Sequence, residues 1–170
     1  DELNIEPAAE TRLLYQAICS GDLDSLRPRR NLPVPGEPPY RGLQFFDESD
    51  AANFFGREAL AARLVERVKQ MAESASPQLA VVGASGSGKS SLVRAGVVPA
   101  LRKLGWQVEV ITPTAHPLQA LDALEGKGLL VVDQFEELFS LCRAESEREA
   151  FLERVFAPGR PVLLVLRAAF

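Results

Sequence analysis

Hydrophobic and polar positions follow two different rhythms along the chain after residue 57. Short apolar runs predict buried strands at Leu79–Val82, Trp106–Ile111, Leu129–Val132 and Pro161–Leu166. Between them, apolar residues three or four positions apart predict helices over Glu58–Ala72, Ser90–Leu104, Pro117–Leu124, Gln134–Leu141 and Glu145–Phe156. Strands of continuous apolar character that alternate with helices indicate an α/β fold, in which helices cover both faces of a parallel sheet.

Two of these helices carry details of their own. The helix over 58–72 is amphipathic, and the face that we expect to be buried carries Leu60, Leu64, Val68 and Met71. The helix over 90–104 contains Pro99, which has no backbone donor, so this helix must either accommodate the proline or kink there. Gly105 follows it and is typical of a helix C-terminus.

The first forty residues have a different character. Residues 1–26 contain one short helical pattern, which buries too little to form a domain and is interpreted as the tail of an upstream module. Residues 27–40 are rich in proline, which restricts the backbone and removes donors, so they predict an extended linker. The arginines of this stretch are either a phosphate-binding patch or part of a solvated linker. The α/β domain is expected to occupy residues 41–170.

Composition narrows the class of protein. The 170 residues are 46% hydrophobic and 25% charged, which is enough apolar sequence to bury a core and is contrary to wholesale disorder. The net charge of −4 argues against direct binding of nucleic acid, which usually needs a basic surface. We expect no membrane segment, because the apolar runs are far shorter than the roughly 18 residues of a span. We also expect no signal peptide, because the first residues have neither a basic nor an apolar region. Cys19 and Cys142 fit reduced thiols and a cytoplasmic location.

The strongest chemical signal is the stretch Gly83-Ala84-Ser85-Gly86-Ser87-Gly88-Lys89-Ser90, which matches the phosphate-binding loop pattern G-x-x-x-x-G-K-[ST]. It lies between a predicted strand and a predicted helix, which is the context that the pattern requires. Glycines let backbone N–H groups converge on phosphate oxygens, and the candidate nucleotide contacts are Gly83, Ser85, Gly86, Ser87, Gly88 and Ser91. Lys89 is expected to reach the β- and γ-phosphates, and the Ser90 hydroxyl is expected to ligate Mg²⁺.

A second signal lies at the end of the strand over 129–132, where Asp133 follows the apolar run. A carboxylate at the carboxyl end of a parallel strand lies where open α/β sheets bind ligands, so Asp133 is expected to hold Mg²⁺ through its water shell. The alternative is that Asp133 caps the helix that follows. Glu136 or Glu137 could orient or deprotonate an attacking water, although the dipole of a helix also favours acids in its first turn.

Four segments in this order resemble a known family. They are Pro39–Leu43, Phe54–Glu58, Val81–Gly96 and Val131–Leu138, and together they are similar to the bacterial novel STAND NTPases, relatives of the NACHT and NB-ARC switch ATPases. The resemblance covers residues 39–170 and implies a three-layer P-loop NTPase sandwich of the AAA+/STAND type. It further implies that Phe55, Gly56 and Arg57 contact the nucleotide, and that Arg167 is a sensor arginine near the γ-phosphate.

The same resemblance implies a wider function. It is that of a slow, Mg²⁺-dependent ATPase that binds ATP and ADP, self-associates in the ATP state, and lies between an upstream effector domain and a downstream sensor or repeat domain in bacterial signalling or defence. The alternative is a nucleotide-binding interaction scaffold without meaningful turnover. A GTPase is disfavoured because no N-K-x-D or T-K-x-D pattern occurs, and a small-molecule P-loop kinase leaves the Phe54–Glu58 segment unexplained.

Two departures from the family pattern concern the end of the chain. Ala169 stands where the family usually has an aspartate. The chain also starts without Met and stops on Phe170, so we expect a piece of a longer protein, cut before the lid and winged-helix domains that enclose ADP in the family. Without that lid, the nucleotide should bind more weakly and exchange faster.

Three features lie outside these motifs. His116 lies in a predicted loop with no acid–base partner near it in sequence, and it is interpreted as a surface residue. Cys142 ends an apolar helix and is interpreted as a buried small hydrophobe. The aromatic residues Phe45, Phe46, Phe54 and Phe55 either pack beneath the nucleotide site or contact the base directly.

Overall fold

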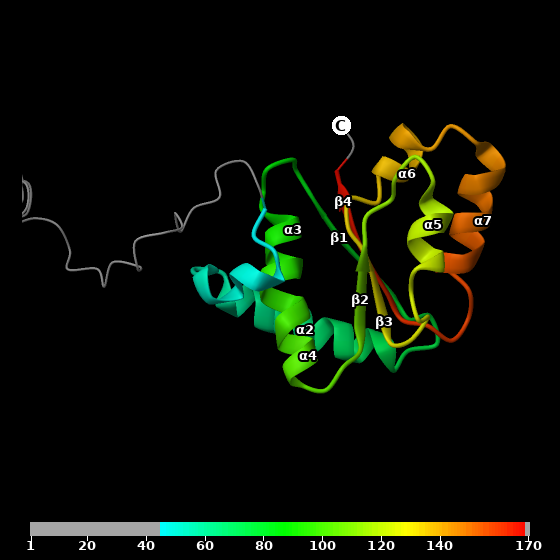
Figure 1. Ribbon diagram of the computed structural model, residues 1–170. Coiled ribbons are helices and arrows are strands. Elements are labelled where there is room, and N and C mark those ends of the chain that lie inside the picture. Colours follow the sequence, from blue (N-terminus) through cyan, green and yellow to red (C-terminus); the bar gives the residue numbers. More distant parts are fainter. Residues whose placement is uncertain (1–44, 169–170) are drawn as a thin grey trace, which may run out of the picture. The chain divides into compact units, whose positions relative to one another are not determined.

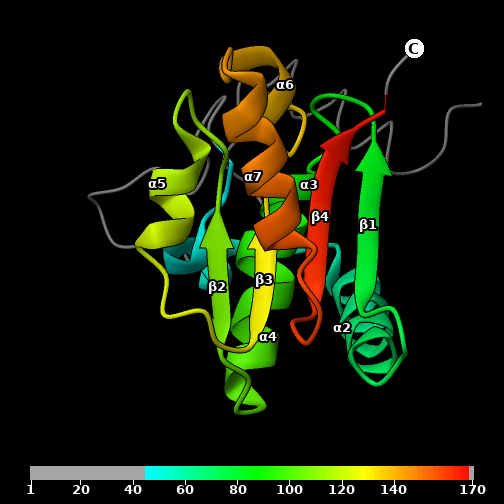
Figure 2. The same cartoon turned by 90° about the vertical axis from the view of Figure 1, so that its right-hand side faces the viewer.

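Four parallel strands form one sheet between two layers of helices (Figure 1), and they lie side by side in the order β1-β4-β3-β2 (Figure 2). In a computed structural model that describes residues 45–168, the strands are β1 (Gln78–Gly83), β2 (Val108–Ile111), β3 (Leu129–Val132) and β4 (Val162–Arg167). All four predicted strands are therefore confirmed, although Trp106 lies before β2 and not within it. The predicted tail over 1–26, the predicted linker over 27–40, and Ala169 and Phe170 lie outside the described residues.

Helices cover both faces of this sheet, which confirms the predicted three-layer α/β sandwich (Figure 2). The layer on one face consists of α2 (Glu58–Ala72), α3 (Lys89–Ser91), η3 (Leu92–Val97) and α4 (Val98–Lys103), with η2 (Glu48–Asn53) packed on it. The layer on the other face consists of α5 (Pro117–Asp122), α6 (Glu137–Leu141) and α7 (Glu145–Val155).

The strand β3 shows why its sequence is apolar without interruption. All four of its residues are buried. Leu129 and Val131 belong to the core shared with α2, η3 and α4, whereas Leu130 and Val132 belong to the core shared with α5, α6 and α7. A central strand with a hydrophobic layer on each side needs apolar residues at every position, so β3 can present a polar group only after its last residue.

The helical run that follows β1 is continuous from Lys89 to Lys103, but it is not a regular α-helix. Its middle third, η3, is a π-helix, and α4 with Pro99 follows directly. In a regular α-helix, the ring of Pro99 would clash with the carbonyl four residues earlier, at Ala95. The wider π turns include Ala95, so the run accommodates the proline without ending, as the sequence left open. It ends at Lys103, Leu104 is its C-cap, and Gly105 follows with a φ of 85°.

The predicted buried face of α2 was partly wrong. Val68 and Met71 are buried as predicted, but Leu60 is 45% exposed, and Ala61 and Val65 are buried in addition. The physical reason is a close helix crossing: a Cβ on Gly96 of η3 would lie 3.1 Å from the Ala61 Cβ. Only small residues fit at this crossing, so it sets the rotation of α2 and turns Leu60 outward, while Leu64 still packs against the core.

The predicted helix over 134–141 was also partly wrong, because α6 begins only at Glu137. Asp133–Glu136 form a turn that is closed by a hydrogen bond from the Glu137 N–H to the Gln134 carbonyl at 2.8 Å. Gln134 has a φ of 53°, and it is the only residue other than glycine with a positive φ among residues 45–168. A left-handed residue cannot continue a right-handed helix, so the chain leaves β3 through a tight turn.

The start of β3 gives a first prediction, on stability. Gly128 has a φ of 67°, and a Cβ there would lie 2.2 Å from the Gln107 backbone oxygen, which accepts a hydrogen bond from Leu129 N–H. Gly128→Ala should lower the free energy of unfolding by about 3 kcal/mol, because strain and a backbone clash add. Gly126→Ala is the matched control: its φ is 75° but no atom lies within 4 Å, so about 1 kcal/mol is expected. Denaturant unfolding measures both, and equal losses would contradict the clash.

Candidate functional site

The loop between β1 and α3 is built on glycines at the positions where its backbone needs them. Gly86 and Gly88 have φ values of 72° and 81°, a region that other residues rarely adopt. Gly83, at the end of β1, is required for a different reason: a Cβ there would lie 3.2 Å from Ser87 Oγ and 3.4 Å from Lys89 Cδ. The loop folds back over Gly83, and this brings Lys89 to the carboxyl end of the sheet.

Among the described residues 45–168, Lys89 has no acidic partner. Its Nζ donates a hydrogen bond to the Ala84 carbonyl at 2.7 Å, across the loop, and this contact is exposed. A neutral, exposed acceptor holds an ammonium group weakly, so an anionic ligand would readily displace it. The amino group is therefore available to a phosphate that enters the loop.

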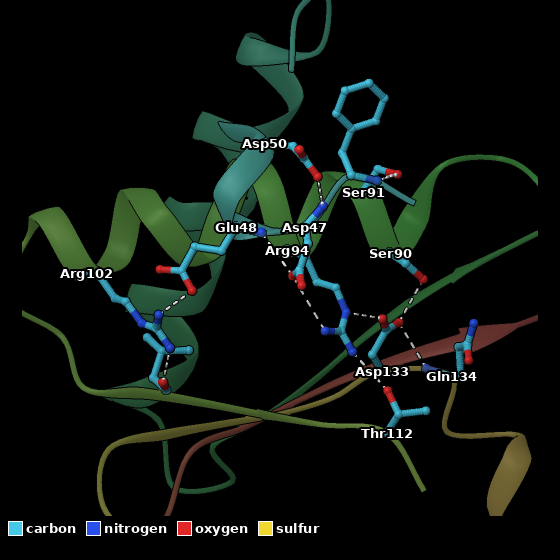
Figure 3. A network of polar contacts seen from close by, with 12 residues as sticks. Asp47, Glu48, Asp50, Ser90, Ser91, Arg94, Arg102, Thr112, Asp133 and Gln134 are labelled. Atoms are coloured by element: carbon cyan, nitrogen blue, oxygen red, sulfur yellow. Dashed lines mark hydrogen bonds and ion pairs between the residues drawn. The ribbon is translucent and has the colours of Figure 1, made fainter. Parts of the chain in front are cut away.

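Asp133 and Ser90 meet where β3 ends beside the first turn of the helical run (Figure 3). The Ser90 hydroxyl donates to Asp133 Oδ1 at 2.9 Å, and the backbone N–H of Gln134 donates to the same oxygen at 3.0 Å. Asp133 is fully buried, whereas its neighbours along the chain towards α6 are not. Because the hydroxyl donates its only hydrogen to the aspartate, the lone pairs of Ser90 Oγ can coordinate a cation.

These groups open onto one cavity of about 490 Å³, which is within the usual range for small-molecule sites. The cavity is lined by Phe45, Ser85, Gly86, Gly88, Lys89, Ser90, Ser91, Asp133, Gln134, Glu136, Val165 and Arg167. It lies at the carboxyl ends of β3 and β4, where open parallel sheets bind ligands. Most of the residues predicted to bind a nucleotide thus line the same cavity.

The two glutamates after Asp133 occupy different positions. Glu136 lines the cavity, and its Oε2 accepts a hydrogen bond from the backbone N–H of Arg167 at 3.1 Å. This contact ties the turn after β3 to the end of β4. Glu137 does not line the cavity. Burial raises the pKa of the Glu137 carboxyl, and the negative charges of Glu136 and Asp133 raise it further. The sequence could not choose between the two acids, and the geometry favours Glu136 for contact with a ligand.

The raised pKa of Glu137 gives a second prediction, on pH. Since the folded protein holds the Glu137 proton more tightly than the unfolded chain, ionisation of this group opposes folding, and stability falls as the pH rises from the unfolded pKa through the folded one. Glu137→Gln should therefore unfold at a slightly higher temperature than the wild type at neutral pH. The difference should vanish below the ordinary carboxyl pKa of 4.5.

Glu58 provides a control of opposite sign. Hydrogen bonds from the backbone N–H groups of Glu58 itself and Gly56 lower the pKa of the Glu58 carboxyl. Its stabilising contribution is present above the unfolded pKa and is lost as the pH falls through the folded pKa. Glu58→Gln should thus lower the melting temperature at neutral pH and not in acid. Melting curves across the acidic range check both variants, and shifts of the same sign would contradict the assignment.

The segment from Phe55 to Arg57, which is predicted to contact the nucleotide, lies outside the cavity wall. Phe55 is 75% exposed, and neither it, Gly56 nor Arg57 lines the cavity. Arg57 does contact the loop: its guanidinium donates to the Ser87 carbonyl at 2.6 Å, close against Gly88. Together with Gly83 and Ser87, Arg57 lines a separate groove between α2 and β1.

The residues of the aromatic cluster lie in three different environments. Phe46 and Phe54 pack on each other with ring centroids 6.2 Å apart, and Phe54 also packs against the core near Gly96. Phe45 instead lines the cavity. Exposed Phe55 does neither, because it lies outside both the core and the cavity wall.

Arg94 is a site residue that the sequence analysis did not assign. It follows Ser90 by one helical turn, so both side chains face Asp133, and its Nε donates to Asp133 Oδ2 at 2.7 Å. A basic residue one turn after the loop serine was a signal that could have found it. Gln134 was missed for another reason, because nothing in the sequence marks its left-handed backbone.

Comparison of the chain with known protein families agrees with a nucleotide site. A family model, novel STAND NTPase 1, matches residues 39–128 and 122–170. The chain belongs to this family. The resemblance drawn from four short segments is therefore confirmed, and the novel STAND NTPase family places the chain among nucleotide-binding switch domains. No curated protein and no solved structure matches the chain.

Two further observations describe this STAND NTPase domain. Within residues 45–168, no helix is both long enough and apolar enough to cross a membrane. The same residues contain no group of three or more His, Cys, Asp or Glu side chains arranged to hold a metal ion. Any divalent cation at Ser90 and Asp133 would consequently need most of its ligands from a bound phosphate and from water, and Mg²⁺ commonly binds in that way.

Proposed function

We propose that this domain binds ATP and ADP together with Mg²⁺, and that it hydrolyses ATP slowly as the switch of a regulatory protein. The observation that carries the proposal is the contact between Ser90 and Asp133 at 2.9 Å, which joins the phosphate-binding loop to the end of β3 beside Lys89. The donor set consists of oxygen atoms, which suits Mg²⁺. Ser90 would ligate the ion directly, and Asp133 would act through its hydration shell.

Each residue of the site has a defined task in this mechanism. The glycine-rich backbone receives the phosphates, and Lys89 leaves the Ala84 carbonyl to neutralise their charge. When bound, Mg²⁺ supplies a positive charge that offsets the negative charge developing on the phosphate oxygens. Glu136, held toward the end of β4 by the Arg167 N–H, orients a water molecule and accepts its proton. The Arg167 side chain, also in the cavity wall, would contact the γ-phosphate.

The preference for adenine and the regulatory role rest on the family. We propose that the ATP state favours self-association and that the ADP state is the resting form, with an effector domain upstream and a sensor or repeat domain downstream. We further propose a role in bacterial signalling or defence and a cytoplasmic location. Direct binding of nucleic acid is not expected, since the net charge is −4.

Calorimetric titration of Mg²⁺–ATP, ADP and GTP into the chain is the first test. The proposal expects heats for both adenine nucleotides and much weaker binding of GTP. Equal affinities for ATP and GTP would contradict the adenine preference, and no binding of any nucleotide would contradict the whole proposal.

The second candidate is an interaction scaffold that binds nucleotides without meaningful turnover. It is favoured by the ion pair between Arg94 and Asp133 at 2.7 Å, because this contact balances the charge of the aspartate without a metal ion. Binding without release of phosphate in a single-turnover assay would select it over the ATPase.

A further inference from the structure

Arg94 joins four separate parts of the chain beside the proposed metal position (Figure 3). Its Nε donates to Asp133 Oδ2 at 2.7 Å, and one terminal nitrogen donates to Thr112 Oγ1 at 2.9 Å. The other terminal nitrogen lies 3.7 Å from Asp47 Oδ1, and the guanidinium carbon lies 4.8 Å from the centre of the Phe45 ring. The helical run, the ends of β2 and β3, and the segment before η2 therefore meet at one side chain.

The ion pair with Asp133 is the most enclosed of these contacts. The Asp133 side chain is fully buried, and the Arg94 side chain is only 15% exposed. A buried carboxylate without a partner of opposite charge is strongly destabilising. It follows that Arg94 is the cation that balances Asp133 as long as no metal ion does so.

The two oxygens of Asp133 have different partners. Oδ1 faces the Ser90 hydroxyl and Oδ2 faces the guanidinium of Arg94. A divalent cation ligated by Ser90 would lie close to this guanidinium, and both would be attracted to the same carboxylate. Two like charges at short range in a partly dehydrated site repel each other appreciably, so the presence of Arg94 should weaken the binding of Mg²⁺.

Asp47 provides a second carboxylate with which the guanidinium of Arg94 can pair. Its side chain is 56% exposed and lies at the opposite end of the guanidinium fork from Asp133, beside the Phe45 ring that can also receive a cation. The segment is anchored nearby, because the Phe46 N–H donates to Ser91 Oγ at 3.1 Å. A shift of the guanidinium toward Asp47 would keep Arg94 paired while it releases Asp133 Oδ2.

We propose that Arg94 is a positioning residue that competes with Mg²⁺ for Asp133, and that Asp47 sets the strength of this competition by drawing the guanidinium away. The proposal rests on the proposed function, since it concerns the same nucleotide site. It makes the segment before η2 a regulator of the metal site: any event that moves Asp47 changes how much Mg²⁺ contributes to nucleotide binding.

The quantity that tests it is the magnesium enhancement, defined as the Kd for ADP in EDTA divided by the Kd for ADP in Mg²⁺, both measured calorimetrically. Arg94→Gln should raise the enhancement about fivefold or more, because a competing charge is removed. Asp47→Asn should lower it about twofold to threefold, as expected for an exposed ion pair. Asparagine remains a good N-cap, so the cap of η2, in which Asp47 accepts from the Glu48 N–H, is retained.

The double variant separates a path through Arg94 from a direct effect of the Asp47 charge on the metal. If Asp47 acts through Arg94, Asp47→Asn has no further effect in the Arg94→Gln background. A second ion pair joins the same two parts of the chain, between Arg102 of α4 and Glu48 of η2, and it provides matched controls. Arg102→Gln and Glu48→Gln should leave the enhancement unchanged.

Stability is measured in parallel. In EDTA, Arg94→Gln should lower the melting temperature because Asp133 loses its counter-charge, and Mg²⁺ with ADP should restore more of it than in the wild type. If Arg94→Gln does not fold, Arg94→Lys keeps the charge but not the fork. It should bind ADP, compete with Mg²⁺, and make the enhancement insensitive to Asp47→Asn.

The outcomes are distinct. If Arg94 has a purely structural role, Arg94→Gln changes the Kd for ADP in EDTA and the Kd for ADP in Mg²⁺ by the same factor. An unchanged or reduced magnesium enhancement in Arg94→Gln would therefore overturn the proposal. An effect of Asp47→Asn that persists in the double variant would overturn it as well. If the wild type binds ADP and these variants fail as described, only the proposal on Arg94 is lost. If the wild type binds no nucleotide in either buffer, the proposed function fails and the role of Arg94 fails with it.

Discussion

Replacing Lys89 with alanine is expected to weaken the binding of ATP and of ADP by more than about a hundredfold, the scale of losing a charge-assisted contact to an enclosed phosphate. The amino group lies at the wall of the cavity and donates a hydrogen bond to the Ala84 carbonyl. The variant removes a positive charge from the cavity wall but leaves the glycines and their backbone unchanged. Titration of Mg²⁺–ATP and of ADP into wild type and variant measures the loss.

The fold should tolerate this change. The hydrogen bond from Lys89 is exposed, so its removal leaves no buried group without a partner, and the melting temperature without nucleotide should remain within a few degrees. Lys103→Ala is the matched control, because Lys103 ends the same helical run that Lys89 begins and does not line the cavity. If the nucleotide affinities of Lys89→Ala lie within threefold of those of Lys103→Ala, the assignment of this loop as the phosphate-binding loop is contradicted.

Replacing Glu136 with glutamine is expected to reduce ATP turnover by about two to three orders of magnitude, the usual contribution of a general base, while ADP affinity changes little. Glutamine keeps an oxygen that can accept the hydrogen bond from the Arg167 N–H, so the turn after β3 should hold its position. It cannot accept a proton from water, however. Phosphate release at saturating ATP, together with calorimetry, separates the loss of chemistry from a loss of binding.

Glu137→Gln is the comparison that makes this result specific. Glu137 is the neighbouring acid and does not line the cavity, so its variant should retain turnover within a few-fold of the wild type. Loss of turnover in Glu137→Gln but not in Glu136→Gln would assign the general base to Glu137 and contradict its assignment to the acid that lines the cavity. Binding by the wild type without any turnover would instead favour the interaction scaffold.

Much of this fold follows from local sequence. β3 was predicted with its exact bounds because a strand between two hydrophobic layers must be apolar throughout. The position of α2 along the chain was likewise predicted, since its apolar spacing has the helical period. Which of its sides is buried was not predictable, because the close approach of Ala61 to Gly96 involves residues far apart in the chain.

The candidate site shows the same division. The loop from Gly83 to Ser90 and the acid at position 133 could be read from the sequence because each is a short pattern beside a strand. The place of Phe55 could not be predicted. Family resemblance suggested a nucleotide contact, whereas the fold leaves this ring 75% exposed and brings Phe45 to the cavity instead.

The α/β class, the order of the elements, the phosphate-binding loop and the family could all be predicted from the amino-acid sequence. These depend on periodicity and on contiguous motifs, which are local properties of the chain. Three features required the packed structure: Glu136 and not Glu137 faces the cavity, Gln134 turns the chain after β3, and Arg94 neutralises Asp133. These arrangements depend on distances between side chains from separate elements, and such distances are set by packing across the sheet after the local elements have formed.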